Sequence, residues 1–115
     1  MTFSAGDVVT VDFPGVTGIK RRPAVVLSSA TYHATRPDVI VGLITTQTTG
    51  LGITDYALQD WQAAGLRVAS IFRSFIVTLP SSANLIRIGQ LSEQDWRGVR
   101  DCVKVAFAEL DNSHP

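Results

Sequence analysis

Hydrophobic and polar residues alternate along the chain in a pattern that predicts a small β-sheet. In residues 7–13 (DVVTVDF), Val9, Val11 and Phe13 share one face of an extended segment, which is typical of a half-buried strand. Short apolar runs rich in β-branched residues come after it in the sequence and have the composition of strands. They predict further strands over residues 23–28, 39–46, 54–58, 67–79 and 84–88.

Glycine, proline and polar residues separate the predicted strands. Pro14 and Gly15 end the first strand, and Pro23 lacks an amide hydrogen, so we expect it at the first position of its strand. Residues 60–65 (DWQAAG) predict a turn or a single helical turn that Gly65 closes. We expect loops over residues 14–21, 30–37 and 47–53.

The spacing of apolar residues changes to a helical period near the C-terminus. Ser92 is a candidate N-cap, and Asp95 three residues later resembles a capping box with Asp in place of Glu. We expect an amphipathic helix that packs on the sheet through Trp96, Val99, Val103, Phe107 and Leu110. The predicted fold is mainly β: a compact barrel or curled sheet with a C-terminal helix, forming one domain over residues 1–115.

Composition narrows the class of protein only modestly. Hydrophobic residues make up 45% of the chain and charged residues 17%, which is typical of a globular protein. The formal net charge is zero, so the overall charge gives no support for nucleic-acid binding. The N-terminus lacks a signal-peptide pattern and no apolar stretch reaches membrane-spanning length. We therefore expect a cytoplasmic protein without a membrane partner.

The sequence gives no reason to expect a metal or a cofactor. His33 and His114 are far apart, the carboxylates lack ligand spacing, and Cys102 is the only cysteine. The glycine-containing stretches do not match a phosphate loop or a dinucleotide fingerprint. A nucleophile elbow of the form GxSxG is absent as well.

Polar residues meet the predicted core strands at two places. Lys20, Arg21 and Arg22 precede the second strand, and Thr45-Thr46-Gln47 ends the third. If these strands are antiparallel neighbours, the start of one lies beside the end of the other. Guanidinium groups would then stand next to hydroxyls and an amide, a combination that can hold a phosphodiester. On composition alone, a solvated basic loop beside a threonine-rich turn is the favoured explanation.

The stretch "GDVVTVDFPGVTGIKRRPAVVLSS", followed by "VIVGLITTQ", resembles the MazF/PemK family of toxin ribonucleases. "IGQLS" before the terminal helix also fits that family. The resemblance implies an SH3-like barrel with a C-terminal helix and a homodimer. It also implies a bacterial, cytoplasmic toxin that cuts single-stranded RNA, including mRNA, at short sequences without a metal and so inhibits growth. A cognate antitoxin would block it, and contact with DNA would be indirect, through the antitoxin complex.

The resemblance also assigns roles to residues by position. The family's catalytic arginine and threonine fall on Arg22 and Thr45. Such a pair would assist attack of the RNA 2′-hydroxyl on the adjacent phosphorus, which needs no metal and leaves a cyclic phosphate. Arg22 would clamp the phosphate oxygens and Thr45 would donate a hydrogen bond to them. The expected RNA-binding residues are Lys20, Arg21, Thr46, Gln47 and Arg73; for Arg73, contact with the antitoxin and a solvent-exposed strand cation without a partner are equally open interpretations.

Other positions depart from the resemblance or stay outside it. Relatives often have an acidic residue followed by Gln where this chain has Ser70 and Ile71, which implies different base contacts. His33 is expected at the surface. For Tyr56 and Trp61, stacking on bases is one interpretation, but packing in the core or in a dimer is favoured.

Two functions without catalysis remain open at this point. The same fold family includes gyrase-poisoning toxins that act by protein contact, and the presence of both Arg22 and Thr45 argues against that reading. A degenerate toxin that only regulates transcription together with its antitoxin is the other alternative.

Overall fold

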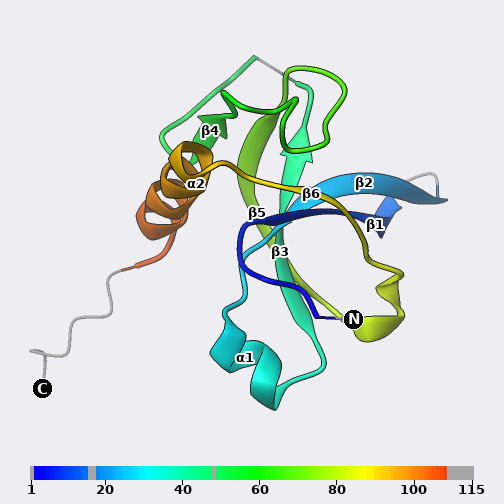
Figure 1. Cartoon of the computed structure of the whole chain (residues 1–115). Helices are drawn as coiled ribbons and strands as arrows, with labels where there is room; N and C mark the ends of the chain where they lie inside the picture. The colour runs from blue at the N-terminus through cyan, green and yellow to red at the C-terminus, as the bar shows by residue number, and fades with distance from the viewer. Residues whose placement is uncertain (1, 16–17, 48, 109–115) are drawn as a thin grey trace, which may run out of the picture.

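The chain folds into a curled antiparallel sheet of six strands with a helix packed on one face (Figure 1). The structure is a computed structural model that describes residues 2–15, 18–47 and 49–108. The strand order is β4-β5-β3-β2-β1-β6. The expected mainly β fold with a C-terminal helix is therefore confirmed. The elements are β1 (Asp7–Gly15), β2 (Gly18–Val26), α1 (Ala30–Thr35), β3 (Val39–Thr45), β4 (Asp55–Ala57), β5 (Ile71–Leu79), the 3-10 turn η1 (Ser81–Ala83), β6 (Ile86–Gln90) and α2 (Glu93–Ala106).

Each face of the sheet carries its own buried apolar cluster, because alternate residues of a strand point to opposite faces. The helix-side cluster contains Val8, Val25 and Phe72 from the sheet and Val99 and Cys102 from α2. The opposite-side cluster consists of Val9, Val11, Ala24, Val26, Val39, Val41 and Leu79. Burial of both clusters fixes which face each strand residue occupies.

The hairpin of β1 and β2 is longer than the sequence suggests. The predicted loop over residues 14–21 is wrong in large part, because pairing continues from Val8↔Val25 out to Gly15↔Gly18. The paired ends of the two strands project to the right in Figure 1. Pro23 is likewise not the first residue of its strand but its sixth, and it pairs with Thr10. It is tolerated there because β2 acquires its β3 partner only from Ala24 onward.

A short helix replaces part of the predicted loop over residues 30–37. Helix α1 has six residues, and the Ser29 hydroxyl caps it by accepting a hydrogen bond from the Tyr32 amide. None of the residues of α1 is buried. A helix without a buried apolar stripe leaves no periodic signal, which explains why the sequence pattern missed it.

Helix α2 begins as expected at Ser92, whose hydroxyl accepts a hydrogen bond from the Asp95 amide over 3.2 Å. Val99 is buried and Trp96 and Val103 pack at the edge of the helix-side cluster, as predicted. Phe107 does not join them: it caps the helix C-terminus and is 58% exposed, because α2 ends at Ala106. Leu110 lies outside the described residues.

Several boundaries differ from the sequence-based expectation by a few residues. β5 begins at Ile71 rather than at residue 67, and β6 covers Ile86–Gln90 rather than residues 84–88. The turn after residue 60 does close at Gly65, which has a φ of 89°. That backbone conformation favours glycine because it has no Cβ.

Asp95 does not complete the capping box but joins α2 to the segment after β4. Its side chain is fully buried and accepts three hydrogen bonds: from the Tyr56 hydroxyl at 2.9 Å, and from the amides of Gln59 at 3.0 Å and Asp60 at 2.8 Å. Burial, the hydrogen bond to Asp95 and the charge of that carboxylate together raise the pKa of Tyr56 to about 12. Ionised Tyr56 would face a carboxylate with no donor between them.

Stability should therefore fall in strongly alkaline solution through Tyr56. Because the folded pKa of about 12 lies above the ordinary 10.0, the stabilisation is complete below pH 10 and is lost as the pH rises through 12. The loss is at most about 2–3 kcal/mol, since water reaches part of the ring. Urea unfolding of wild type and Tyr56→Phe at pH 8 to 12 measures it. A variant whose stability falls in parallel with that of wild type would contradict the assignment.

Replacement of Gly98 by Ala should destabilise the protein, although alanine favours helices by about 1 kcal/mol. A Cβ at Gly98 would overlap the ring of Tyr56, which Asp95 holds in place. We expect a net loss of about 1–3 kcal/mol, seen as a lower Tm by circular dichroism. The neighbouring exposed residue gives the control, Arg97→Ala, which should change Tm little. An unchanged or higher Tm for Gly98→Ala would refute the close packing.

Candidate functional site

The pairing of β2 with β3 brings the two polar segments together. The register Ala24↔Leu43, Val25↔Gly42 and Val26↔Val41, continued by two residues, places Arg22 opposite Thr45. Both residues line a depression of about 300 Å³, together with Lys20, Arg21, Pro23, Ile44 and Thr46. The structure therefore has the juxtaposition that the sequence suggested.

The depression forms because β2 continues where β3 stops. From Gly18 to Pro23, β2 pairs only with β1, while the chain leaves β3 after Thr45. The backbone amide of Gln47 donates to Thr45 Oγ1 over 3.3 Å. The threonine hydroxyl thus accepts a bond from its own chain and keeps its proton to donate outward. Thr46 and Gln47 are exposed beside it.

The cations of the segment are not equivalent. Arg21 forms an ion pair with Asp12 at 2.9 Å, and its second nitrogen donates to the carbonyl of Thr10 at 3.0 Å and to the Thr10 hydroxyl at 3.1 Å. Within the described residues, Lys20 and Arg22 make no ion pair or hydrogen bond through their side chains. Arg22 and Lys20, rather than Arg21, are therefore the cations that can accept an anion without first losing a partner.

Arg73 lies on the same face of the sheet as Thr45. Thr45 pairs with Ile71, and Arg73 is two residues further along β5, so alternation puts it on that face. Its Nη2 donates to the carbonyl of Thr49 at 3.4 Å, and its Nε is buried without a partner in the described part of the chain. Its cross-strand neighbour Asp55 makes no ion pair with it but accepts a bond from the Gly52 amide.

Ser70 and Ile71 are buried where β5 begins, beside Thr45. Ile71 is 2% exposed and pairs directly with Thr45 across the strands. Ser70 is 5% exposed, and its hydroxyl donates to the carbonyl of Val68 at 2.8 Å. Neither residue is among those that line the depression.

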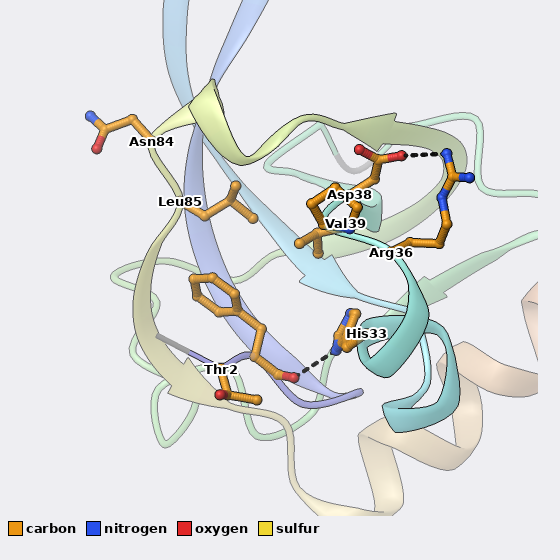
Figure 2. Close-up of a pocket in the computed structure, with 9 residues that line it drawn as sticks. Thr2, His33, Arg36, Asp38, Val39, Asn84 and Leu85 are labelled. Carbon is orange, nitrogen blue, oxygen red and sulfur yellow. Dashed lines mark hydrogen bonds and ion pairs between the residues drawn. The ribbon is translucent and has the colours of Figure 1, made fainter.

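His33 lies elsewhere and is not the surface residue we expected. It lines a separate cavity of about 470 Å³. The cavity lies between the N-terminal segment, α1, the start of β3 and the segment before β6 (Figure 2). The ring is partly buried, and both nitrogens have partners: Ser28 Oγ at 2.5 Å and the Phe3 carbonyl at 2.8 Å. The charges of Arg36 and Asp38 in this cavity pair with each other at 3.4 Å. His33 therefore anchors α1 to the N-terminal segment.

The aromatic residues after β4 belong to the packing of the core. Tyr56 and Trp61 both pack against the helix-side cluster, which confirms core packing over base stacking for these two. In residues 2–15, 18–47 and 49–108, no three His, Cys, Asp or Glu side chains gather as metal ligands. No helix in that part of the chain is both long and apolar enough to span a membrane.

Solved structures of MazF proteins and of endoribonucleases have a similar fold. MazE-MazF (Form-III) from Deinococcus radiodurans superposes with a TM-score of 0.76 at 20% identity, over 92% of this chain and 96% of that chain. An endoribonuclease in complex with its cognate antitoxin, from Mycobacterial species, gives 0.74 at 17% identity, over 91% and 94%. The Mycobacterium tuberculosis toxin MazF-mt6 gives 0.66 at 24% identity, over 85% and 95%. No curated protein matches the sequence.

The curled sheet with its terminal helix is thus the fold of MazF proteins. The family described as the PemK-like, MazF-like toxin of type II toxin-antitoxin systems matches residues 4–107. The chain belongs to this family.

Proposed function

We propose that this toxin is an endoribonuclease that cuts single-stranded RNA at short sequences without a metal ion. The observation that carries the proposal is the position of Arg22 opposite Thr45 at the mouth of the β2–β3 pair. Membership of the toxin family and the description of one structural neighbour as an endoribonuclease support it.

The proposed reaction uses the RNA's own 2′-hydroxyl as the nucleophile. A bond forms between the 2′-oxygen and phosphorus, and the bond to the 5′-oxygen breaks, so the products are a 2′,3′-cyclic phosphate and a 5′-hydroxyl. Arg22, which is always protonated, clamps the non-bridging oxygens as negative charge accumulates on them. Thr45 donates a hydrogen bond from its hydroxyl group to one of the same oxygens.

Proton transfer needs no further residue of the depression. None of the described residues that line it carries a carboxylate or an imidazole, so we assign removal of the 2′-hydroxyl proton to solvent. Arg22 can donate a hydrogen bond to the departing 5′-oxygen. The proton that this oxygen takes up comes from water. Lys20, Thr46, Gln47 and Arg73 then hold the RNA on either side of the scissile phosphate, and Arg21 steadies the hairpin through Asp12.

We further propose that residues 1–115 form one toxin domain that acts as a homodimer in the bacterial cytoplasm. A cognate antitoxin would inhibit it, and DNA would be contacted only through the antitoxin complex. Structural neighbours crystallised as MazE-MazF complexes, or with a cognate antitoxin, support the antitoxin as partner.

Cleavage of a long single-stranded RNA in the presence of EDTA tests the proposal. Wild type should give discrete cuts, and Arg22→Ala or Thr45→Ala should slow cleavage by about 10²–10³-fold, the scale of losing one transition-state donor. Arg22→Lys should recover little, because an ammonium cannot bind two oxygens side by side. Arg97→Ala, an exposed charge on α2, is the matched control and should cut at the wild-type rate.

Absence of cleavage by folded wild-type protein, over RNAs of many sequences, would overturn the nuclease. A toxin that acts by protein contact, or a regulator that acts only with its antitoxin, would then take its place. Cleavage that persists in both Arg22→Ala and Thr45→Ala would support the ribonuclease activity but would show that its active site lies elsewhere.

A further inference from the structure

Two phenylalanine rings contact each other on the face of the sheet that carries Arg22 and Thr45. The rings of Phe13 and Phe75 meet edge to face, with centroids 5.7 Å apart and planes at 66°. Phe13 is on β1 and Phe75 on β5, with β2 and β3 between them in the sheet order. The contact therefore crosses the hollow side of the curled sheet.

The pair has one buried and one open member. Phe13 is partly buried against the opposite-side cluster, whereas Phe75 is 54% exposed. Val77 and Leu79 continue the same face of β5 into that cluster, so the apolar core ends at Phe75. A large aromatic ring held by one neighbour and open on its other side is a rigid, accessible surface.

Cations and the candidate site surround this ring on the same face. Phe13 pairs with Lys20, and Val11 pairs with Arg22, on the adjacent strand. On β5, Arg73 is two residues from Phe75. The pairing of β3 with β5 is irregular between Gly42↔Ile76 and Ile44↔Phe72. Because β3 advances by two residues there and β5 by four, both even numbers, the side chains of the two strands keep the same faces. Phe75 thus shares its face with Arg22, Thr45 and Arg73.

The spacing fits an RNA strand that runs from the phosphate site to the ring. Val11 is the cross-strand partner of Arg22, and Phe13, which contacts Phe75, lies two residues further along β1. The rise along the strand from Val11 to Phe13 is about 7 Å. That distance is on the scale of one extended nucleotide. Lys20 and Arg73 stand beside the ring, where the flanking phosphates of such a strand would lie.

We propose that Phe75, steadied by Phe13, stacks against a base of the RNA that neighbours the scissile phosphate. The inference rests on the proposed ribonuclease function and names the contact that holds the neighbouring nucleotide. Stacking suits this surface because Phe75 exposes an aromatic ring that has no hydrogen-bonding group of its own. A stacked base contributes about 1–3 kcal/mol and tolerates any base identity.

The test uses binding of an oligonucleotide that cannot be cut. The probe is a short RNA that wild type cleaves, made with a 2′-deoxy residue at the cut and with one abasic residue moved through the flanking positions. With wild type, one position next to the cut should lose about 5- to 150-fold in affinity on removal of its base. With Phe75→Ala, intact RNA should bind more weakly by a similar factor, and removal of that base should cost nothing further.

A matched pair of variants separates stacking from packing. Phe75→Leu keeps an apolar side chain against Phe13 but loses the aromatic face, so it should bind RNA as poorly as Phe75→Ala. Phe75→Tyr should bind like wild type. Equal affinity of wild type and Phe75→Leu, or an abasic cost that persists in Phe75→Ala, would overturn the inference while cleavage by wild type left the nuclease intact.

A role for Phe75 in protein contact gives a different outcome. If Phe75→Ala shifted the protein's mass in solution, by light scattering, at unchanged affinity for the oligonucleotide, the ring would belong to an interface between copies and the stacking proposal would fail. If wild type cut no RNA at all, the proposed function itself would fail first.

Discussion

The antiparallel register between β2 and β3 is the constraint on which the site depends. Ala24, Val25 and Val26 lie in the centre of the sheet, where both faces are covered by buried clusters. A slip of one residue would turn every side chain of β2 to the other face, so Val25 would leave the helix-side cluster and Ala24 and Val26 would leave the opposite-side cluster. The buried valines therefore fix the face on which Arg22 stands, as well as its level opposite Thr45. A guanidinium held in this way is better oriented than one in a loop.

Local placement, rather than overall charge, provides for an anionic substrate. The formal net charge of the chain is zero, and a basic excess is the usual sign of a nucleic-acid partner. The Asp12–Arg21 ion pair removes one cation from the cluster, since alternation turns Arg21 away from Arg22. Lys20 and Arg22, the cross-strand partners of Phe13 and Val11, remain on the hollow side. A small number of cations on one curved face, without an ion-pair partner among the described residues, suffices for a phosphate site. The net charge of the whole chain does not reveal such a local group.

The fold could be predicted where buried apolar residues recur with the period of a strand or of a helix. Val9, Val11 and Phe13 alternate, and Val99 and Val103 recur at helical spacing, so the first strand and the last helix could be predicted. Helix α1 could not, because it buries nothing. The extension of the hairpin beyond Pro14 could not either, since proline and glycine there predict a loop and β2 has no third strand beside it at that end.

The candidate site shows the same division. The meeting of the Arg22 and Thr45 segments follows from antiparallel neighbours, which the order of short strands suggests. The ion pair of Arg21 with Asp12 depends on the register of the β1–β2 hairpin, which places these two residues opposite each other. Because the sequence pattern predicts a loop over residues 14–21, it gives no register from which this pair could be predicted. The Phe13–Phe75 contact joins strands that are not neighbours in the sheet. It depends on curvature, and no pattern in a single strand specifies how strongly a sheet curls.

The two faces of the sheet separate stability from the proposed chemistry. On one face, α2 covers the helix-side cluster, and the buried carboxylate of Asp95 ties the helix to the segment after β4. On the other face, the opposite-side cluster extends from Val39 and Leu79 to Val11, the cross-strand partner of Arg22. The remaining end carries Arg22, Thr45 and Arg73, and no described helix covers it. Residues can therefore change at the open end without disturbing the packing that holds the sheet together.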